Sequence, residues 1–212
     1  MEISQLGDGM YEIPIEHVRS FVLTDSPSGA VTVVDTGFEH TADEFVATLE
    51  SAFDEVDRLI LTHDGPDHYG GVEAMMRRFE PTLCAPADEQ GLLDALDRDP
   101  DITFTDGDVL DGGIEVIQVP GHTPSPSALL VRNKGALISG DVLDGADRRG
   151  LPAGYLLPPP ELYNHDHAAA ERNLSTLLEY DFEAVFVFHG SHVTNEPKAK
   201  IDHYLNFREH YR

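Results

Sequence analysis

The segment that most constrains the fold of this chain is a ten-residue stretch that follows a short apolar run. Residues 58–61 are typical of a buried β-strand, and the chain continues as Thr62-His63-Asp64-Gly65-Pro66-Asp67-His68-Tyr69-Gly70-Gly71. Two imidazoles and a carboxylate within six residues of a strand end form a ligand set that suits zinc, iron or manganese. The alternative is a polar loop that gathered these residues by chance. The stretch therefore favours a metal site at the edge of a sheet.

Three further predicted strands are each followed by a histidine or an aspartate. His122 follows residues 114–119, Asp141 follows residues 136–138, and His189 follows residues 184–188. Each is a weak signal by itself, because such residues in Pro/Gly turns are more commonly plain turn residues. Four strand ends that deliver His or Asp in order favour one site built from loops at a sheet edge.

The rest of the chain alternates short β-type runs with amphipathic helices. Strands are predicted over residues 9–13, 20–24, 30–35, 58–62, 82–85, 102–105, 114–119, 127–131, 136–140 and 184–188, and helices over 41–53, 72–79, 88–97, 166–180 and 197–211. Thr41 and Glu44 have the spacing of a capping box. Residues 144–164 form the least regular stretch, which is long enough to be a functional loop. Two β-rich blocks with helices predict two sheets with helices outside them.

Acidic residues dominate the charge of the chain. Its 212 residues include 39 Asp and Glu but 14 Lys and Arg, for a formal net charge of −25. These acids are spread along the whole sequence, and their mutual repulsion is screened at molar salt, where the Debye length is roughly 3 Å. We therefore expect a salt-adapted protein of halophilic type. The clustered Lys and Arg that hold phosphate backbones are absent from the sequence, although a site for a short nucleic acid is not excluded.

Several other classes of protein find no support in the sequence. The single cysteine, Cys84, excludes an intramolecular disulfide, and its apolar neighbours predict a buried thiol. No stretch approaches the roughly 18 apolar residues of a membrane helix, so we expect a soluble, cytoplasmic protein with no membrane partner. Neither a Gly-x-Ser-x-Gly elbow nor a P-loop is present, which excludes serine hydrolase and P-loop chemistry. The oligomeric state stays open.

Five ordered motifs resemble those of the metallo-β-lactamase superfamily, most closely its glyoxalase II-like and general hydrolase members. They are Val34-Asp35-Thr36-Gly37, residues 62–68, residues 120–123, Gly140-Asp141 and His189-Gly190. The resemblance covers nearly the whole chain. It implies a single metallo-β-lactamase-like domain over residues 1–212, with an α/β fold arranged as a four-layer αββα sandwich and a metal site at one edge of the two sheets.

The same resemblance assigns roles to individual residues. One metal would be bound by His63, His122 and Asp141, and a second by Asp67, His68, Asp141 and His189, with Asp141 bridging the two. Asp35 would order the ligand loops, and Asp67 would also act as the catalytic residue that orients the attacking hydroxide and accepts its proton. The implied cofactor is Zn²⁺, as one or two ions, or another divalent transition metal.

One position departs from the pattern of the family. Its metal loop usually reads His-x-His-x-Asp-His, whereas Gly65 stands here in place of the second histidine. Three protein ligands plus water still make a catalytic zinc site. Asp64 as a substitute oxygen ligand and His192 as an additional neighbour both stay open, whereas His165 and His167 are interpreted as capping or surface residues.

The predicted function is metal-dependent hydrolysis, in which metal-bound hydroxide attacks a thioester, lactone or other carboxyl ester of a small-molecule substrate. One alternative is a nuclease or phosphodiesterase of the same superfamily. Another is a degenerate, non-hydrolytic metal-binding member, because Gly65 replaces a ligand. Specificity would come from the loops around Tyr69 and residues 144–164, and from the C-terminal helix.

Overall fold

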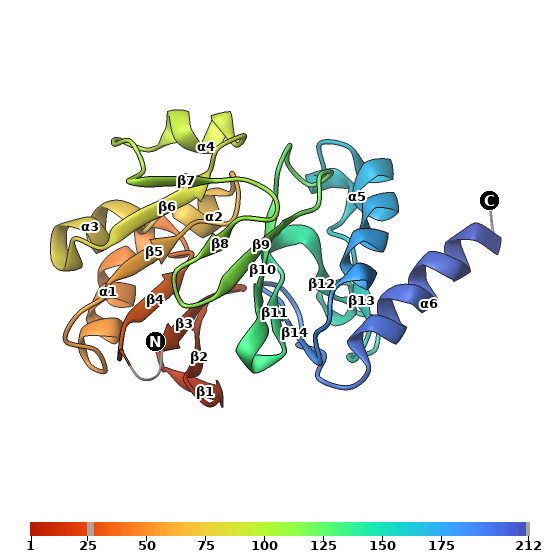
Figure 1. Ribbon diagram of the computed structural model, residues 1–212, viewed down its shortest axis with the longest axis horizontal. Helices are drawn as coiled ribbons and strands as arrows, with labels where there is room; N and C mark the ends of the chain where they lie inside the picture. The colour runs from red at the N-terminus through yellow and green to blue at the C-terminus, as the bar shows by residue number, and fades with distance from the viewer. Residues whose placement is uncertain (25–27, 211–212) are drawn as a thin grey trace. The chain divides into compact units, whose positions relative to one another are not determined.

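The computed structural model describes residues 1–24 and 28–210, and the chain divides into two compact units, Met1–Phe104 and Thr105–Arg212 (Figure 1). Each unit contains one large β-sheet with its own helices. Among the described residues, no helix is both long and apolar enough to cross a membrane. The mixed α/β class expected from the sequence is confirmed, and the assignment of residues 1–212 to a single domain stays a prediction.

Unit 1 is built on a seven-stranded sheet in sequential order from β1 to β7. Its strands are β1 (Ser4–Gly7), β2 (Met10–Ile15), β3 (Val18–Thr24), β4 (Val31–Val34), β5 (Arg58–Ile60), β6 (Thr82–Pro86) and β7 (Ile102–Phe104); its helices are η1 (Glu39–Thr41), α1 (Ala42–Glu50), α2 (Pro66–Tyr69), α3 (Val72–Phe79) and α4 (Gln90–Ala95). Strands β4 to β7 run parallel, and Val34 pairs with Ile60. The carboxyl ends of β4 and β5 therefore lie side by side, which brings Asp35 next to the segment that carries His63.

Unit 2 is built on a five-stranded sheet in the order β14-β11-β10-β9-β8 and a two-stranded ribbon of β12 and β13. Its strands are β8 (Val109–Leu110), β9 (Ile114–Gln118), β10 (Ser127–Val131), β11 (Ala136–Ile138), β12 (Asp144–Gly145), β13 (Leu156–Leu157) and β14 (Ala184–Phe186); its helices are η2 (Arg132–Lys134), η3 (Gly140–Val142), η4 (Ala146–Arg149), η5 (Glu161–Tyr163), α5 (His167–Asn173), η6 (Leu174–Glu179) and α6 (Pro197–His210).

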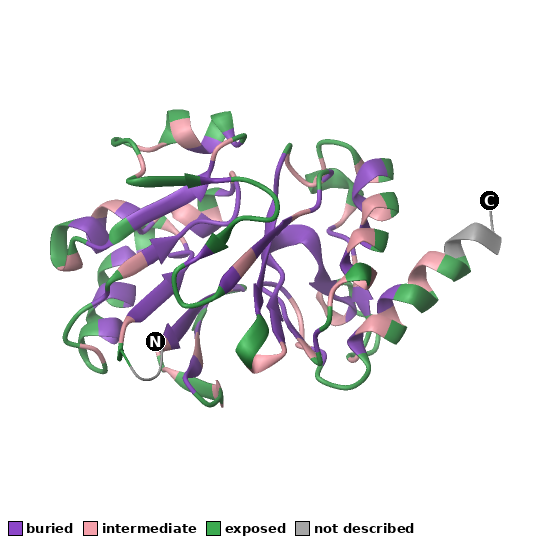
Figure 2. Ribbon diagram, in the orientation of Figure 1, coloured by how far each residue is buried: buried purple, intermediate pink, exposed green. Residues whose placement is uncertain are grey.

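The pairing of these strands explains where the polar residues of unit 2 gather. Strand β11 is antiparallel to β10 and parallel to β14, and β9 is also antiparallel to β10. Strands β9, β11 and β14 therefore share one direction and end at the same edge of the sheet. The core of this unit is apolar, and Ile117, Leu130, Leu137, Val185 and Ile201 are fully buried in it. Figure 2 shows that the strands of unit 2 are largely buried.

Most predicted elements agree with the structure to within a few residues, and α3 and β10 agree at both ends. The helix predicted over residues 166–180 is instead divided into α5 and η6. The capping box is absent, because Thr41 Oγ1 donates to the Phe38 carbonyl at 2.9 Å. The predicted buried thiol is confirmed, since Cys84 lies buried in β6. Residue 211, the predicted end of the C-terminal helix, lies outside the described residues.

Candidate functional site

In unit 1, a buried aspartate organises the histidine loop. Asp35 follows β4 with a φ of 56°, a left-handed conformation that aspartate tolerates better than most residues. Its Oδ1 accepts from the Thr62 backbone N–H at 2.9 Å, and its Oδ2 accepts from the Thr62 hydroxyl and from His68 Nδ1, both at 2.7 Å. Complete burial raises the pKa of Asp35 above its ordinary value, and the neighbouring His68 and the hydrogen bonds offset only part of this rise. This carboxylate therefore connects the end of β4 to both ends of the loop.

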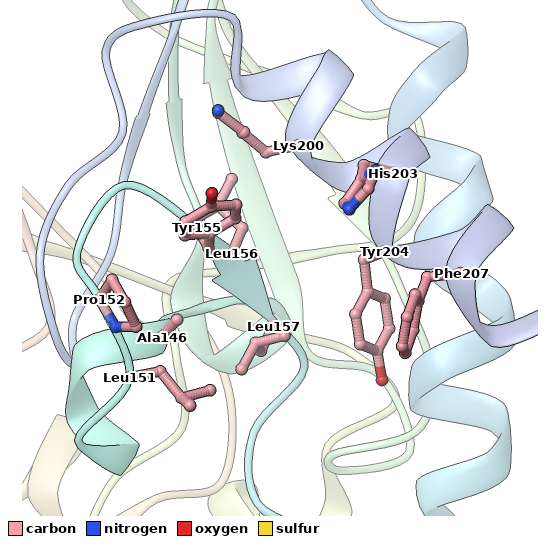
Figure 3. A pocket seen from close by; sticks show the side chains of 10 residues that line it. All are labelled: Ala146, Leu151, Pro152, Tyr155, Leu156, Leu157, Lys200, His203, Tyr204 and Phe207. Atoms are coloured by element: carbon pink, nitrogen blue, oxygen red, sulfur yellow. The ribbon is translucent and has the colours of Figure 1, made fainter.

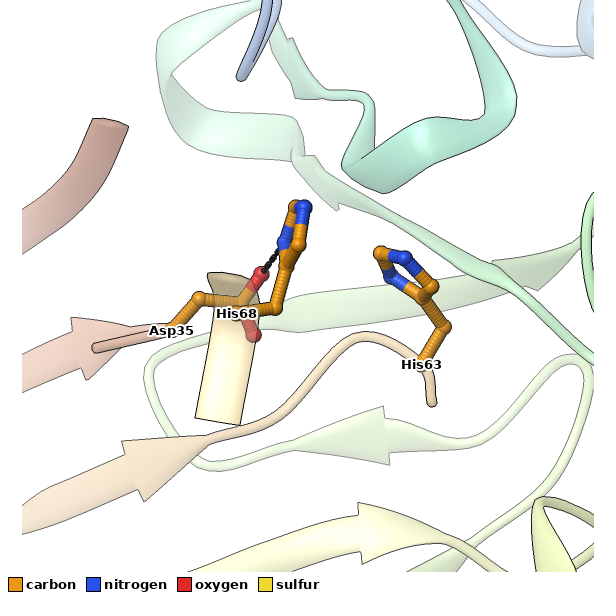
Figure 4. A group of neighbouring side chains, drawn as sticks. All are labelled: Asp35, His63 and His68. Atoms are coloured by element: carbon orange, nitrogen blue, oxygen red, sulfur yellow. Dashed lines mark hydrogen bonds and ion pairs between the residues drawn. The ribbon is translucent and has the colours of Figure 1, made fainter. Parts of the chain in front are cut away.

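These hydrogen bonds also orient the two imidazoles of unit 1. The Thr62 hydroxyl donates to Asp35, so it accepts from His63 Nδ1 at 2.9 Å, and His68 Nδ1 donates directly to Asp35. In both rings the proton is thus assigned to Nδ1, and Nε2 carries the lone pair that binds a metal. Ligand atoms of Asp35, His63 and His68 lie within 4.8 Å of one another, and both histidines are buried (Figure 4).

Asp67 lies beside this pair on the short helix α2. Its Oδ1 is 4.0 Å from His68 Nε2, and its side chain is 26% exposed, whereas His68 is fully buried. Asp67 is thus a partly solvated carboxylate next to a buried imidazole nitrogen. This placement is compatible with either a ligand or a proton acceptor.

Gly65, the position that departs from the family pattern, is closely surrounded by these side chains. A Cβ at Gly65 would lie 2.9 Å from His63 Nε2 and 3.0 Å from His68 Cδ2. Asp64 points elsewhere: its carboxylate packs against Gly91 of α4, its backbone N–H donates to Glu89, and burial raises its pKa. Within unit 1, the structure therefore does not bring Asp64 into the cluster of Asp35, His63 and His68.

In unit 2, the three predicted ligands converge at the sheet edge. Asp141 Oδ2 lies 3.6 Å from His122 Nε2 and 3.5 Å from His189 Nε2. Asp141 and His189 are buried, and the His122 side chain is 11% exposed. One carboxylate oxygen facing two imidazole nitrogens, each from the end of a different strand, is a geometry that a metal cation would complete.

Glycines permit the close backbone approach that this convergence requires. Gly121, just before His122, has a φ of 149°, and a Cβ there would collide with the backbone of Ala170 in α5. Gly190, just after His189, has a φ of 81° and packs against the backbone of Gly145.

Asn164 is a residue that the sequence interpretation missed. Its Oδ1 accepts from His122 Nδ1 at 3.0 Å, while its Nδ2 donates to the Pro159 carbonyl at 2.9 Å and to His167 Nδ1 at 2.7 Å. His122 Nε2 is thereby left to face Asp141. The only sequence signal was its position at the end of the irregular segment 144–164.

Two other residues near these ligands have mainly structural contacts. His192 Nδ1 accepts from the Val187 backbone N–H at 3.1 Å, and its ring lies 5.1 Å from the ring of Phe186. Asp144 is buried and pairs with Arg148 at 2.6 Å. Burial, reinforced by the nearby charge of Asp141, raises the pKa of Asp144 to about 7.

Comparisons with known proteins show which proteins this chain is similar to. Over 195 residues the chain is 26% identical to a protein called Beta-lactamase-like protein 2 homolog from Drosophila melanogaster, an alignment that covers 83% of this chain and 60% of that protein. A hydroxyacylglutathione hydrolase from Methylobacillus flagellatus is 31% identical over 153 residues, covering 70% of this chain and 56% of the enzyme. The chain thus spans a little over half the length of these two relatives.

The fold is also shared with solved structures. A metallo-beta-lactamase from Pontibacter korlensis superposes with a TM-score of 0.76 at 16% identity and covers 98% of both chains. A subclass B3 metallo-beta-lactamase of Bradyrhizobium japonicum gives a TM-score of 0.71 at 14% identity, over 99% of this chain and 91% of that one. The sequence model of the metallo-beta-lactamase superfamily matches residues 15–189, and this chain therefore belongs to that superfamily.

Proposed function

We propose that this protein is a metal-dependent hydrolase of a small-molecule thioester, lactone or other carboxyl ester, with His63, Asp67, His68, His122, Asp141 and His189 as its metal ligands. The hydroxyacylglutathione hydrolases among its relatives support a hydrolase. Zinc, as one or two ions, is the proposed metal because imidazole and carboxylate ligands suit it.

One observation carries this proposal: second hydrogen bonds fix the ligand imidazoles in the form that binds a metal. His63 and His68 use Nδ1 to reach Thr62 and Asp35, and His122 uses Nδ1 to reach Asn164. Metal-bound histidines almost always have such a partner on the other ring nitrogen, because it sets the tautomer and the ring orientation. The second nitrogen is directed at a carboxylate in two of these rings: His68 Nε2 faces Asp67, and His122 Nε2 faces Asp141. A histidine that serves only to fill the core does not require this arrangement.

When bound, zinc polarises the attacked carbonyl oxygen and lowers the pKa of a coordinated water towards roughly 7. The side chains of the protein do the rest. Asp67, partly exposed at the start of α2, accepts the proton of the attacking water at its carboxylate. Asp35 and Asn164 hold the imidazoles in place and contact no substrate.

The excess of acidic residues, 39 Asp and Glu against 14 Lys and Arg, supports a further part of this proposal, namely that the enzyme works at high salt. With a net charge of −25, the folded chain repels itself at low ionic strength. Assays are therefore best made in molar potassium chloride.

The first test measures metal content per chain in high salt, together with hydrolysis of a thioester, a lactone and a phosphodiester. We expect zinc to be retained, and one of the carboxyl substrates to be cleaved. His68→Ala and Asp141→Asn, one in each unit, should both lower metal content and activity, whereas His40→Ala is the control because His40 is exposed and pairs with Glu16. Cleavage of the phosphodiester alone would favour the nuclease alternative. Bound metal without hydrolysis of any of the three substrates would favour the non-hydrolytic, metal-binding alternative.

A further inference from the structure

Unit 2 contains an open apolar pocket formed by the irregular segment 144–164 and helix α6. Its volume is about 260 Å³, and Figure 3 shows Leu151, Tyr155 and Leu156 on the loop side and Tyr204 and Phe207 on the helix side. Leu151, Tyr155 and Phe207 are 50%, 46% and 56% exposed, so solvent reaches large apolar side chains here. Exposed apolar side chains that line a concave surface commonly mark a site for a ligand or a partner.

The charges around this pocket are unlike those of the rest of the chain. Its described lining includes Lys200 and His203 but neither Asp nor Glu, although the chain has 39 acidic residues. Lys200 is one of three lysines in the sequence, and its ammonium lies 5.0 Å from the centre of the Tyr155 ring. A cation beside an apolar surface that lacks carboxylates favours a ligand with an apolar body and an anionic head.

Hydrogen bonds and pairing hold both walls of the pocket in place. The Tyr204 hydroxyl donates to Glu171 at 2.7 Å, and Leu156 belongs to β13, which pairs with β12. The pocket is also joined to the metal-ligand segments of the same unit. Ala146 lines it, and the preceding Gly145 backbone N–H donates to the His189 carbonyl at 2.9 Å. Binding to a preorganised wall costs little ordering entropy.

We propose that this pocket binds a medium-chain carboxylate, with its alkyl chain between Tyr155 and Phe207 and its carboxylate at Lys200. A volume of 260 Å³ holds roughly nine groups the size of a water molecule, which matches a chain of about eight carbons. Such an acid is the acyl product of ester hydrolysis, so this substrate class rests on the proposed function. The binding itself needs no metal.

The test is calorimetric titration of the metal-depleted protein with butyrate, hexanoate and octanoate in high salt. Burial of each added methylene should tighten binding about two- to four-fold. Lys200→Gln should weaken octanoate binding about three- to five-fold and leave octanol binding unchanged, because only the acid has a charge to lose. Lys134→Gln, in η2 of the same unit and outside the pocket lining, is the matched control.

The apolar wall is tested by Leu151→Ala, with Leu162→Ala as its control, since Leu162 is 85% exposed and lies outside the lining. Leu151→Ala alone should weaken octanoate binding several-fold. Equal affinities for the three acids, or equal effects of each variant and its control, would overturn the proposal. So would dissociation of a dimer by Phe207→Ala in sedimentation, because a second copy would then cover the pocket. Octanoate binding without any ester hydrolysis would refute the proposed function and leave the pocket standing.

Discussion

Gly65 offers the sharpest test of how the histidine loop is arranged. In Gly65→Ala, the new Cβ would lie 2.9 Å from His63 Nε2, whereas ordinary contacts between such atoms are about 3.5 Å or longer. The imidazole must therefore move by roughly 0.6 Å, about three times the ±0.2 Å within which metal–ligand distances are usually satisfied. Because the His63 ring is buried and its Nδ1 is hydrogen-bonded to the Thr62 hydroxyl, this movement also strains that hydrogen bond.

We expect Gly65→Ala to weaken zinc binding about 10- to 100-fold, the usual cost of disturbing a group that orients a ligand. Competition with a chromogenic chelator measures the dissociation constant, and far-UV circular dichroism confirms folding. Gly7→Ala is the control, since a Cβ there meets nothing within 4 Å.

Gly65→His extends the test, because it restores the histidine that the family pattern has at this position. The same Cβ contact should prevent this histidine from acting as a simple added ligand. Zinc affinity within two-fold of wild type for Gly65→Ala, or an extra tightly bound ion in Gly65→His, would refute the reasoning.

Three more predictions follow from the contacts in both units. Asn164→Ala removes the partner of His122 Nδ1 and should weaken zinc binding about ten-fold, whereas Asn173→Ala, which loses a bond to the Pro120 carbonyl, should not; equal affinities would contradict this role. Asp144 has a pKa of about 7 when folded and 3.8 ordinarily, so the unfolding free energy of metal-depleted protein should fall by about 4 kcal/mol between pH 4 and 8. The unfolding free energy of Asp144→Asn, measured by urea titration at each pH, should lack that fall. The same pH dependence in Asp144→Asn as in the wild type would contradict the assignment. Finally, the melting temperature of the wild type should rise as potassium chloride increases from about 0.1 to 2 M, and a flat response would argue against salt adaptation.

The sign of the Asp144 effect follows from its raised pKa. Between its two pKa values the unfolded chain is ionised while the folded chain retains the proton, so the unfolded state is favoured progressively as pH rises. Above about pH 7 both states are ionised, and the penalty stays constant.

The sequence predicted which strand ends carry the candidate ligands, but not the contacts that those residues make. Each proposed ligand lies in the segment that follows a predicted strand. Strands with alternating or apolar patterns can be predicted from sequence, and the loops that follow them are located at the same time. Strands β8, β12 and β13 were missed because two residues carry no periodicity. Asn164 was missed because its partner, His122, is 42 residues away, and only the folded chain brings them together. The Thr41 capping box failed because η1 precedes α1 and engages the same hydroxyl.

The left-handed backbone conformation of Asp35 limits how far the folding stability of this protein can be raised at that position. Its left-handed conformation and its buried carboxylate each oppose folding, and both exist to hold Thr62 and His68. Glycine at this position would adopt the same φ without strain, but it would leave the Thr62 N–H, the Thr62 hydroxyl and His68 Nδ1 buried without the oxygens that accept from them. The hydrogen bonds that anchor the histidine loop therefore also hold the strained backbone of Asp35 in place, so relief of that strain and an intact loop are opposed at this one position.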